Sequence, residues 1–135
     1  MGMLRALLSS SGWIITNKKL CHQIGITETV FLSELISEMD TYTENGTLED
    51  DDWFYASIPK IKKETSLTKD QQLRIVKKLT SLKILKTKLI SPKGKISHER
   101  HFKINFSIIE NMLKNTQWAG NPTINGRERQ LAYIY

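Results

Sequence analysis

The chain has 135 residues, a single cysteine and a net charge of +6. This length fits one compact domain with an apolar core, and the lone Cys21 excludes an internal disulfide. A secretory apolar region and a long uncharged apolar run are both absent, so we expect a cytoplasmic protein that makes no membrane contact.

Charged residues are distributed unevenly along the chain. Residues 1–52 carry three basic and nine acidic side chains, whereas residues 53–105 carry fourteen basic and three acidic ones. A basic block confined to one part of a fold is typical of a surface that binds a polyanion. The alternative is a set of solvated lysines on ordinary helices, and charge alone does not separate the two interpretations.

The N-terminal third predicts two helices and a loop. Asn17 is a good N-cap for a short helix that Gly25 ends, and Thr27 is expected to cap a longer helix. The polar residues 41–52 then predict a surface loop. Apolar side chains recur at helical spacing in the longer helix and predict the central core helix: Phe31, Leu32, Leu35, Ile36 and Met39.

A pair of short helices is predicted after a short aromatic strand at residues 53–55. Ser57, with Pro59 in the first turn, opens a helix that ends near residue 65. Thr68 and Gln71 then form a capping box, which starts a second helix expected to run to about residue 81.

The second helix of this pair is amphipathic. Gln72 lies on the side of its helical wheel that carries the apolar residues, whereas Arg74 and Lys77 point the opposite way. The apolar side comprises Ile75, Val76, Leu79 and Leu82. The sequence therefore predicts one face packed on a core and one cationic face in solvent.

Two strands and a last helix complete the pattern. Residues 85–89 and 101–106 alternate between apolar and polar positions, so each predicts a strand with one buried face, and residues 91–94 predict the turn between them. Ser107 and Glu110 form a capping box for a final helix. We assign residues 1–115 to one domain with its core in residues 12–106. We expect residues 116–135 to be a tail, a linker or the start of a second domain.

This order of elements predicts an α+β, mostly helical fold, a winged helix-turn-helix with a two- to three-stranded antiparallel wing sheet. In such a fold the second helix of the pair can enter a major groove, and the hairpin can touch the flanking backbone. The expected partner is double-stranded DNA. The side chains that we expect to contact it lie on that helix and on the hairpin: Lys69, Gln71, Arg74, Lys77, Lys78, Lys93, Lys95 and Arg100.

Catalytic motifs are not apparent in the sequence. Residues 98–101 resemble a zinc-protease motif but are one residue too short, and on a strand His98 and His101 would face opposite ways. A phosphate-binding loop, a glycine-rich dinucleotide turn and a nucleophile elbow are also absent. We therefore expect no enzyme activity, no metal and no cofactor.

Four segments carry a resemblance to a known family. Residues 52–58, 65–72, 77–79 and 100–104 read DWFYASI, TSLTKDQQ, KKL and RHFKI. Together they resemble the N-terminal winged-helix domain of phage replisome organisers and of plasmid or conjugative-element replication initiators, which are related to the primosomal DnaD proteins. The resemblance spans roughly residues 12–106.

The resemblance implies sequence-specific DNA binding in replication initiation of a phage or mobile element in a bacterial host. In that family the helix with the Gln-Gln pair meets DNA, which adds Gln72 to the expected contacts. The resemblance is compatible with a homodimer formed through the N-terminal helices and Trp13, which would present two reading helices to DNA. It is also compatible with host or phage replication proteins as partners.

Two alternatives stay open. A transcriptional regulator on the same scaffold would read a duplex with the same helix. A protein-binding module, such as a phage-encoded antagonist of a host factor, would instead use Asp70, Leu73 and the acidic N-terminal half.

Overall fold

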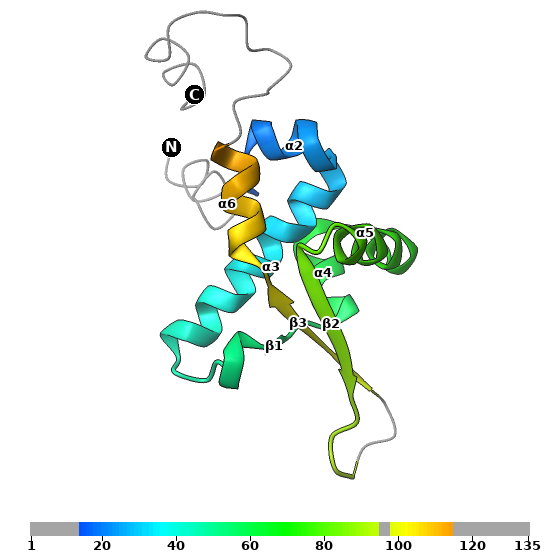
Figure 1. Cartoon of the computed structure of the whole chain (residues 1–135). Helices are drawn as coiled ribbons and strands as arrows, with labels where there is room; N and C mark the ends of the chain where they lie inside the picture. The colour runs from blue at the N-terminus through cyan, green and yellow to red at the C-terminus, as the bar shows by residue number, and fades with distance from the viewer. Residues whose placement is uncertain (1–13, 95–97, 115–135) are drawn as a thin grey trace, which may run out of the picture.

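The computed structural model describes residues 14–94 and 98–114 (Figure 1). Its elements, in chain order, are α2 (Lys18–Ile24), α3 (Ile26–Glu44), the 3₁₀ turn η2 (Asp50–Asp52), β1 (Phe54–Tyr55), α4 (Ile58–Thr65), α5 (Lys69–Ser81), β2 (Leu85–Ile90), β3 (Glu99–Ile104) and α6 (Phe106–Lys114). The strands form an antiparallel sheet in the order β1-β3-β2. The predicted α+β, mostly helical, winged-helix-like arrangement is confirmed. Trp13, Lys95 and the tail at residues 116–135 lie outside the described residues.

The first two helices are separated by a single glycine. The side chain of Asn17 accepts a hydrogen bond from the Leu20 amide at 3.0 Å, as its predicted capping role requires. Gly25 has a φ of 109°, a value that side-chain-bearing residues rarely adopt, and it turns the chain directly into α3. The prediction that Thr27 caps α3 is therefore wrong, because the helix already begins at Ile26.

Helix α3 is also longer than the sequence suggested. It continues to Glu44, so the first residues of the predicted loop at 41–52 are helical. Thr41 and Thr43 donate their hydroxyl hydrogens to carbonyls one turn back, at 3.2 and 3.0 Å. These bonds satisfy the polar side chains within the helix, which is why a polar stretch does not end it here.

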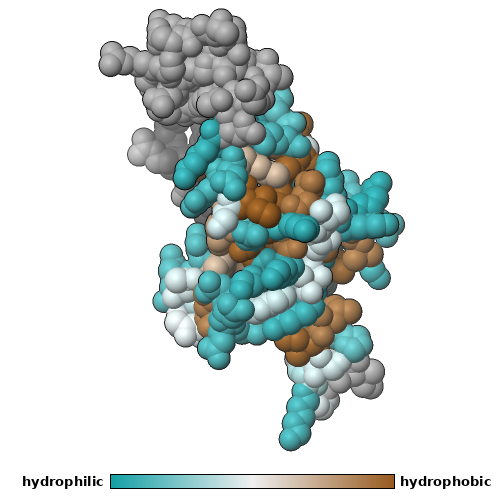
Figure 2. All heavy atoms as spheres, viewed as in Figure 1, coloured by the Kyte–Doolittle hydropathy of each residue, from teal (hydrophilic) through white to brown (hydrophobic). Residues whose placement is uncertain are grey.

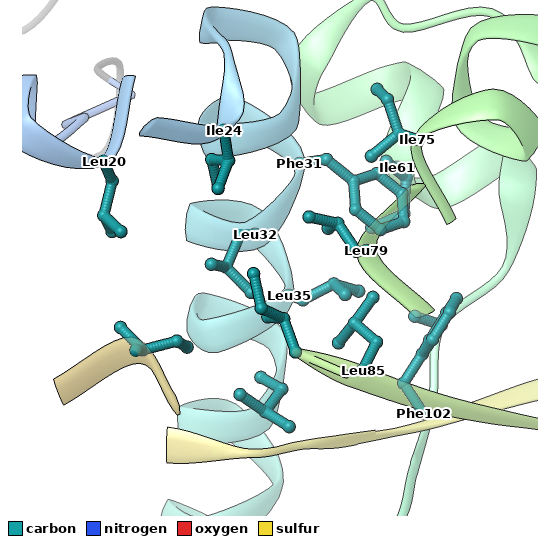
Figure 3. Packing of buried hydrophobic residues seen from close by; sticks show 14 of the residues in the cluster. Leu20, Ile24, Phe31, Leu32, Leu35, Ile61, Ile75, Leu79, Leu85 and Phe102 are labelled. Atoms are coloured by element: carbon teal, nitrogen blue, oxygen red, sulfur yellow. The ribbon is translucent and has the colours of Figure 1, made fainter. Parts of the chain in front are cut away.

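The core surrounds α3. Phe31, Leu32 and Leu35 are buried on it, as the helical spacing predicted (Figure 3). They meet residues from both helices of the pair and from the sheet, including Ile61, Ile75, Leu79, Leu85 and Phe102. The rings of Phe31 and Phe102 pack edge to face with centroids 6.0 Å apart. This core holds the two-helix pair and the sheet against one central helix.

The hairpin extends beyond this core. Leu85 is opposite Ile104, and both are buried, but Leu89 further along β2 is 68 % exposed. The alternation of apolar and polar residues along β2 therefore predicted which way its side chains point, but not whether they are buried. Among the described residues, no helix lies beneath the outer half of the hairpin (Figure 1). Figure 1 shows β2 and β3 projecting away from the helices as a wing.

Helix α6 packs against α2. Helix α6 begins at Phe106, so Ser107 is not its N-cap and Phe106 is not a strand residue, contrary to the prediction. Lys19 Nζ donates to the Leu113 carbonyl at 2.7 Å, and Gln23 Nε2 donates to the Met112 carbonyl at 2.9 Å. Side chains of α2 thus bind the carbonyls at the end of α6, which would otherwise lack partners within the helix.

Candidate nucleic-acid interface

Helix α5 begins with a complete capping box. Thr68 Oγ1 accepts a hydrogen bond from the Gln71 amide at 3.2 Å, and Gln71 Oε1 accepts one from the Thr68 amide at 2.8 Å. The predicted start and end of this helix are both confirmed. The Gln71 side chain, expected to contact DNA, is half-buried and already engaged in the cap.

One side of α5 is packed into the core. Ile75 and Leu79 are buried there, and Leu79 is fully enclosed. Gln72 is also completely buried, with an exposed fraction of 0 %. The apolar side of the predicted helical wheel therefore faces the molecule, except for Leu82, which caps the end of α5 and is exposed.

The opposite side of α5 is open to solvent. Lys69, Arg74 and Lys77 are exposed, and within residues 14–94 and 98–114 their side chains form no hydrogen bond or ion pair. Asp70 and Leu73 share this exposed surface, which we call the α5 face. Figure 2 shows hydrophilic residues, with hydrophobic ones directly below them, at the right-hand edge of the molecule, where Figure 1 places α5. Three predicted contact residues thus lie together on one uncovered surface.

Lys78 lies at the border of the α5 face and has protein partners. Its Nζ donates to the Ile24 carbonyl at 2.7 Å and lies 3.4 Å from Glu28 Oε2. Burial alone would raise the pKa of Glu28, but hydrogen bonds from Thr27, from its own backbone amide and from Lys78 outweigh burial and lower the pKa. Lys78 therefore joins α5 to the corner between α2 and α3, although half of its side chain stays exposed.

The Gln72 side chain is buried inside the protein, so the prediction that it contacts DNA is wrong. Its Nε2 donates to the Ile58 carbonyl at 3.1 Å and to the Leu67 carbonyl at 3.0 Å. Its Oε1 accepts a hydrogen bond from Arg100 Nη2 at 2.9 Å. The buried amide thus connects α5 to the start of α4, to the turn between the helices and to β3.

Arg100 is likewise directed inward and not toward the wing surface. Its Nε donates to the Ala56 carbonyl at 3.1 Å, and its guanidinium carbon lies 4.8 Å from the centre of the Phe102 ring. Burial lowers the pKa of Arg100 to about 10, which leaves the group charged at neutral pH. The prediction that Arg100 contacts DNA is therefore also corrected, because its donors serve the interior.

The wing carries several exposed lysines. Lys93 lies exposed in the turn that follows β2, as predicted, and Lys95 falls outside the described residues. Lys88 covers the Trp53 ring with its Nζ 4.2 Å from the ring centre, and Lys103 pairs with Asp51 at 2.7 Å. Lys93 is therefore the predicted wing residue that the structure places in solvent.

Other exposed lysines near α5 were not among the predicted contacts. Lys62 and Lys63 lie in the last turn of α4, just before the turn that leads into α5, and Lys83 follows α5 with a φ of 63°. All three belong to the basic block of the sequence, so the charge distribution marks them, but the helical wheel of residues 69–81 does not include them.

His101 lies in β3 and His98 directly precedes that strand, and the two side chains have different surroundings. His98 hydrogen bonds to Ser91, whereas His101 stacks on Tyr55 and lies between Glu49 and Glu99, at 2.6 and 3.4 Å. In the part of the chain that the structure covers, no group of three or more histidine, cysteine or acidic side chains is arranged to hold a metal ion. These same residues include no helix long and apolar enough to cross a membrane.

No protein-family model, curated protein or solved structure matches this chain.

Proposed function

We propose that this protein binds double-stranded DNA by inserting α5 into a major groove while the β2–β3 wing contacts the adjacent backbone. The observation that carries the proposal is the α5 face: three cations that have no partner among the described residues, on a helix whose other side is packed into the core. A helix that is rigid on one side and cationic on the other fits a groove lined by phosphates.

The three cations of the α5 face have different roles in this proposal. Arg74 lies near the middle of the helix and can donate two parallel hydrogen bonds to a guanine edge. Lys69 lies in the first turn, where backbone amides also favour an anion, and Lys77 lies two turns further along. Both lysines suit phosphates on either side of the groove, which position the helix without reading sequence.

The salt dependence of binding follows from the number of exposed cations. Four predicted contacts are free in solvent within the described residues, namely Lys69, Arg74, Lys77 and Lys93. Each phosphate neutralised contributes about −0.9 to the slope of log K against log salt, so we expect a slope of about −4. Raising salt from about 50 to about 200 mM should then weaken binding roughly a hundredfold.

Fluorescence anisotropy with a random-sequence duplex at these two salt concentrations tests the proposal. The double variant Arg74→Ala, Lys77→Ala should bind at least about tenfold more weakly, with a slope nearer −2, because two contacts are lost. The matched control is Lys18→Ala, Lys114→Ala, which removes the same charge from exposed positions on α2 and α6. Equal losses in both variants, or binding that ignores salt, would contradict the proposal.

The biological step that we propose is replication initiation on a phage or mobile element. The resemblance of residues 52–58, 65–72, 77–79 and 100–104 to initiator domains supports this step over promoter control. A footprint of the protein on the DNA of its own element distinguishes the two, because protection over an origin supports initiation and protection over a promoter supports regulation.

A further inference from the structure

Leu73 is the large apolar residue on the otherwise charged α5 face. Its side chain is 47 % exposed, although Ile75, two positions along, is buried. The other large exposed apolar residues of the described part of the chain belong to other elements or follow the end of α5: Ile14, Ile15, Ile26, Leu82, Leu89, Phe106 and Leu113. Leu73 is therefore the large exposed apolar side chain that α5 itself contributes to its face.

Cations surround this leucine along the helix. Lys69 and Lys77 lie four residues before and after Leu73, and neighbours at this spacing share one side of a helix. Arg74 follows it directly and is also exposed. The surface that complements this pattern has a small apolar group at its centre and negative charge on both sides.

A thymine in a major groove has this arrangement. Its 5-methyl group projects into the groove between two phosphate backbones, and adenine, guanine and cytosine have no such methyl group. We propose that Leu73 contacts a thymine 5-methyl group and so makes the protein prefer duplexes with thymine at the position facing the middle of α5. This inference rests on the proposed DNA binding and adds a base preference to it.

The charge of the α5 face favours DNA over a protein as the occupant. A docking surface for a protein needs a contiguous apolar area, whereas here one apolar side chain lies beside three cations, Lys69, Arg74 and Lys77, and the single carboxylate of Asp70. A protein that covered this face would have to desolvate three cations for the sake of one leucine. A duplex pairs Lys69 and Lys77 with phosphates and Arg74 with the edge of a base.

DNA that lacks the thymine 5-methyl group tests the inference without any change to the protein. Wild-type protein first enriches a sequence from a random duplex pool. That duplex is then synthesised in two forms, with thymine or with deoxyuridine, which differ only in the 5-methyl group. We expect wild type to bind the deoxyuridine form about fourfold more weakly, as burial of one methyl-sized group predicts.

Variants identify the residue that senses the methyl group. Leu73→Ala should bind both duplex forms equally, whereas Leu73→Met, which keeps an apolar side chain, should retain the preference. Leu82→Ala removes an exposed leucine just beyond the end of α5 and should also retain it. Because Leu73 is exposed and alanine favours helix, the substitution leaves the fold intact.

The outcomes separate this inference from the proposed function. Salt-dependent binding with equal affinity for the two duplex forms would overturn the inference and leave DNA binding standing. A preference for thymine that survives Leu73→Ala would also overturn it. Failure to bind any duplex would overturn both proposals.

Discussion

Arg100 Nη2 donates a hydrogen bond to Gln72 Oε1 at 2.9 Å, and this single bond joins the wing strand β3 to helix α5. The same two side chains also bind the carbonyls of Ala56, Ile58 and Leu67. The helix that we propose as the reading helix is thus joined to the wing, to the residue after β1 and to α4 through one polar network. The α5 face and the wing therefore keep a fixed relation to each other.

Removing the Gln72 amide should be costly. Gln72→Ala removes a hydrogen-bond partner from the Ile58 and Leu67 carbonyls and from one guanidinium nitrogen of Arg100, so we expect a loss of about 2 to 3 kcal/mol in the free energy of unfolding, measured by urea denaturation. The matched control is the adjacent Gln71→Ala, which loses only a capping bond and should cost about 0.5 to 1 kcal/mol. Similar costs for the two variants would contradict the network.

Two leucines of one strand test where the core ends. Leu85 is 2 % exposed and Leu89 is 68 % exposed, although both belong to β2. Leu85→Ala should lower the unfolding free energy by about 2 to 5 kcal/mol, whereas Leu89→Ala should change it by less than about 0.5 kcal/mol. Thermal or urea unfolding of both variants measures the difference. A large loss for Leu89→Ala would mean that the wing is packed and does not project.

The carboxylate of Asp70 should weaken DNA binding. Asp70 is exposed on the α5 face, where its charge repels phosphates. Asp70→Asn should raise affinity for random duplex DNA roughly two- to fivefold at low salt, with the gain shrinking as salt rises. Asp40→Asn, an exposed carboxylate on α3, is the control and should change affinity less. If Asp70→Asn weakens binding, the carboxylate itself is a DNA contact.

Stability should depend on pH through Glu34. Burial first, and then the neighbouring carboxylates of Glu38 and Glu64, raise the pKa of Glu34 from 4.5 to about 7. The folded state therefore binds this proton more tightly than the unfolded state. The stability that the proton confers is complete below about pH 4.5 and is lost as pH rises through about 7.

Urea denaturation at about pH 5 and about pH 8 measures this effect. Because Glu34 is only partly buried and its charge is therefore partly screened by solvent, we expect a contribution of only about 1 kcal/mol, which Glu34→Gln should abolish. Glu44→Gln removes an exposed carboxylate from the same helix and should keep the wild-type difference. If Glu34 instead made the protein more stable at the higher pH than at the lower one, the predicted direction of this pH dependence would be wrong.

Local signals in the sequence predicted the elements of the fold well. The Thr68 capping box located the start of α5, and the spacing of Phe31, Leu32 and Leu35 located the core helix. The boundaries that failed depend on longer-range geometry. Gly25 joins two helices without a linker. Leu89 follows the apolar–polar alternation of β2, but it lies on the part of the strand that extends beyond the core. Neither is visible in the local pattern.

The candidate site was predicted less completely. Helical spacing separated Arg74 and Lys77 from the buried side of α5, and it placed Gln72 on that buried side, where the structure finds it. The family resemblance instead implied that Gln72 contacts DNA, and here the helical wheel was the better guide. Arg100 shares its strand face with Phe102, two positions along, so strand alternation alone could have predicted its inward direction.

The most direct test of DNA binding through α5 is a nitrogen–proton NMR titration with a duplex of about 20 base pairs, two helical turns. We expect amide shifts concentrated in Lys69–Ser81 and in the wing turn near Lys93, with α2 and α6 unchanged. In the Arg74→Ala, Lys77→Ala variant the shifts should fade at the same DNA concentration. Shifts confined to α2 and α6, or none at any DNA concentration, would contradict the central claim.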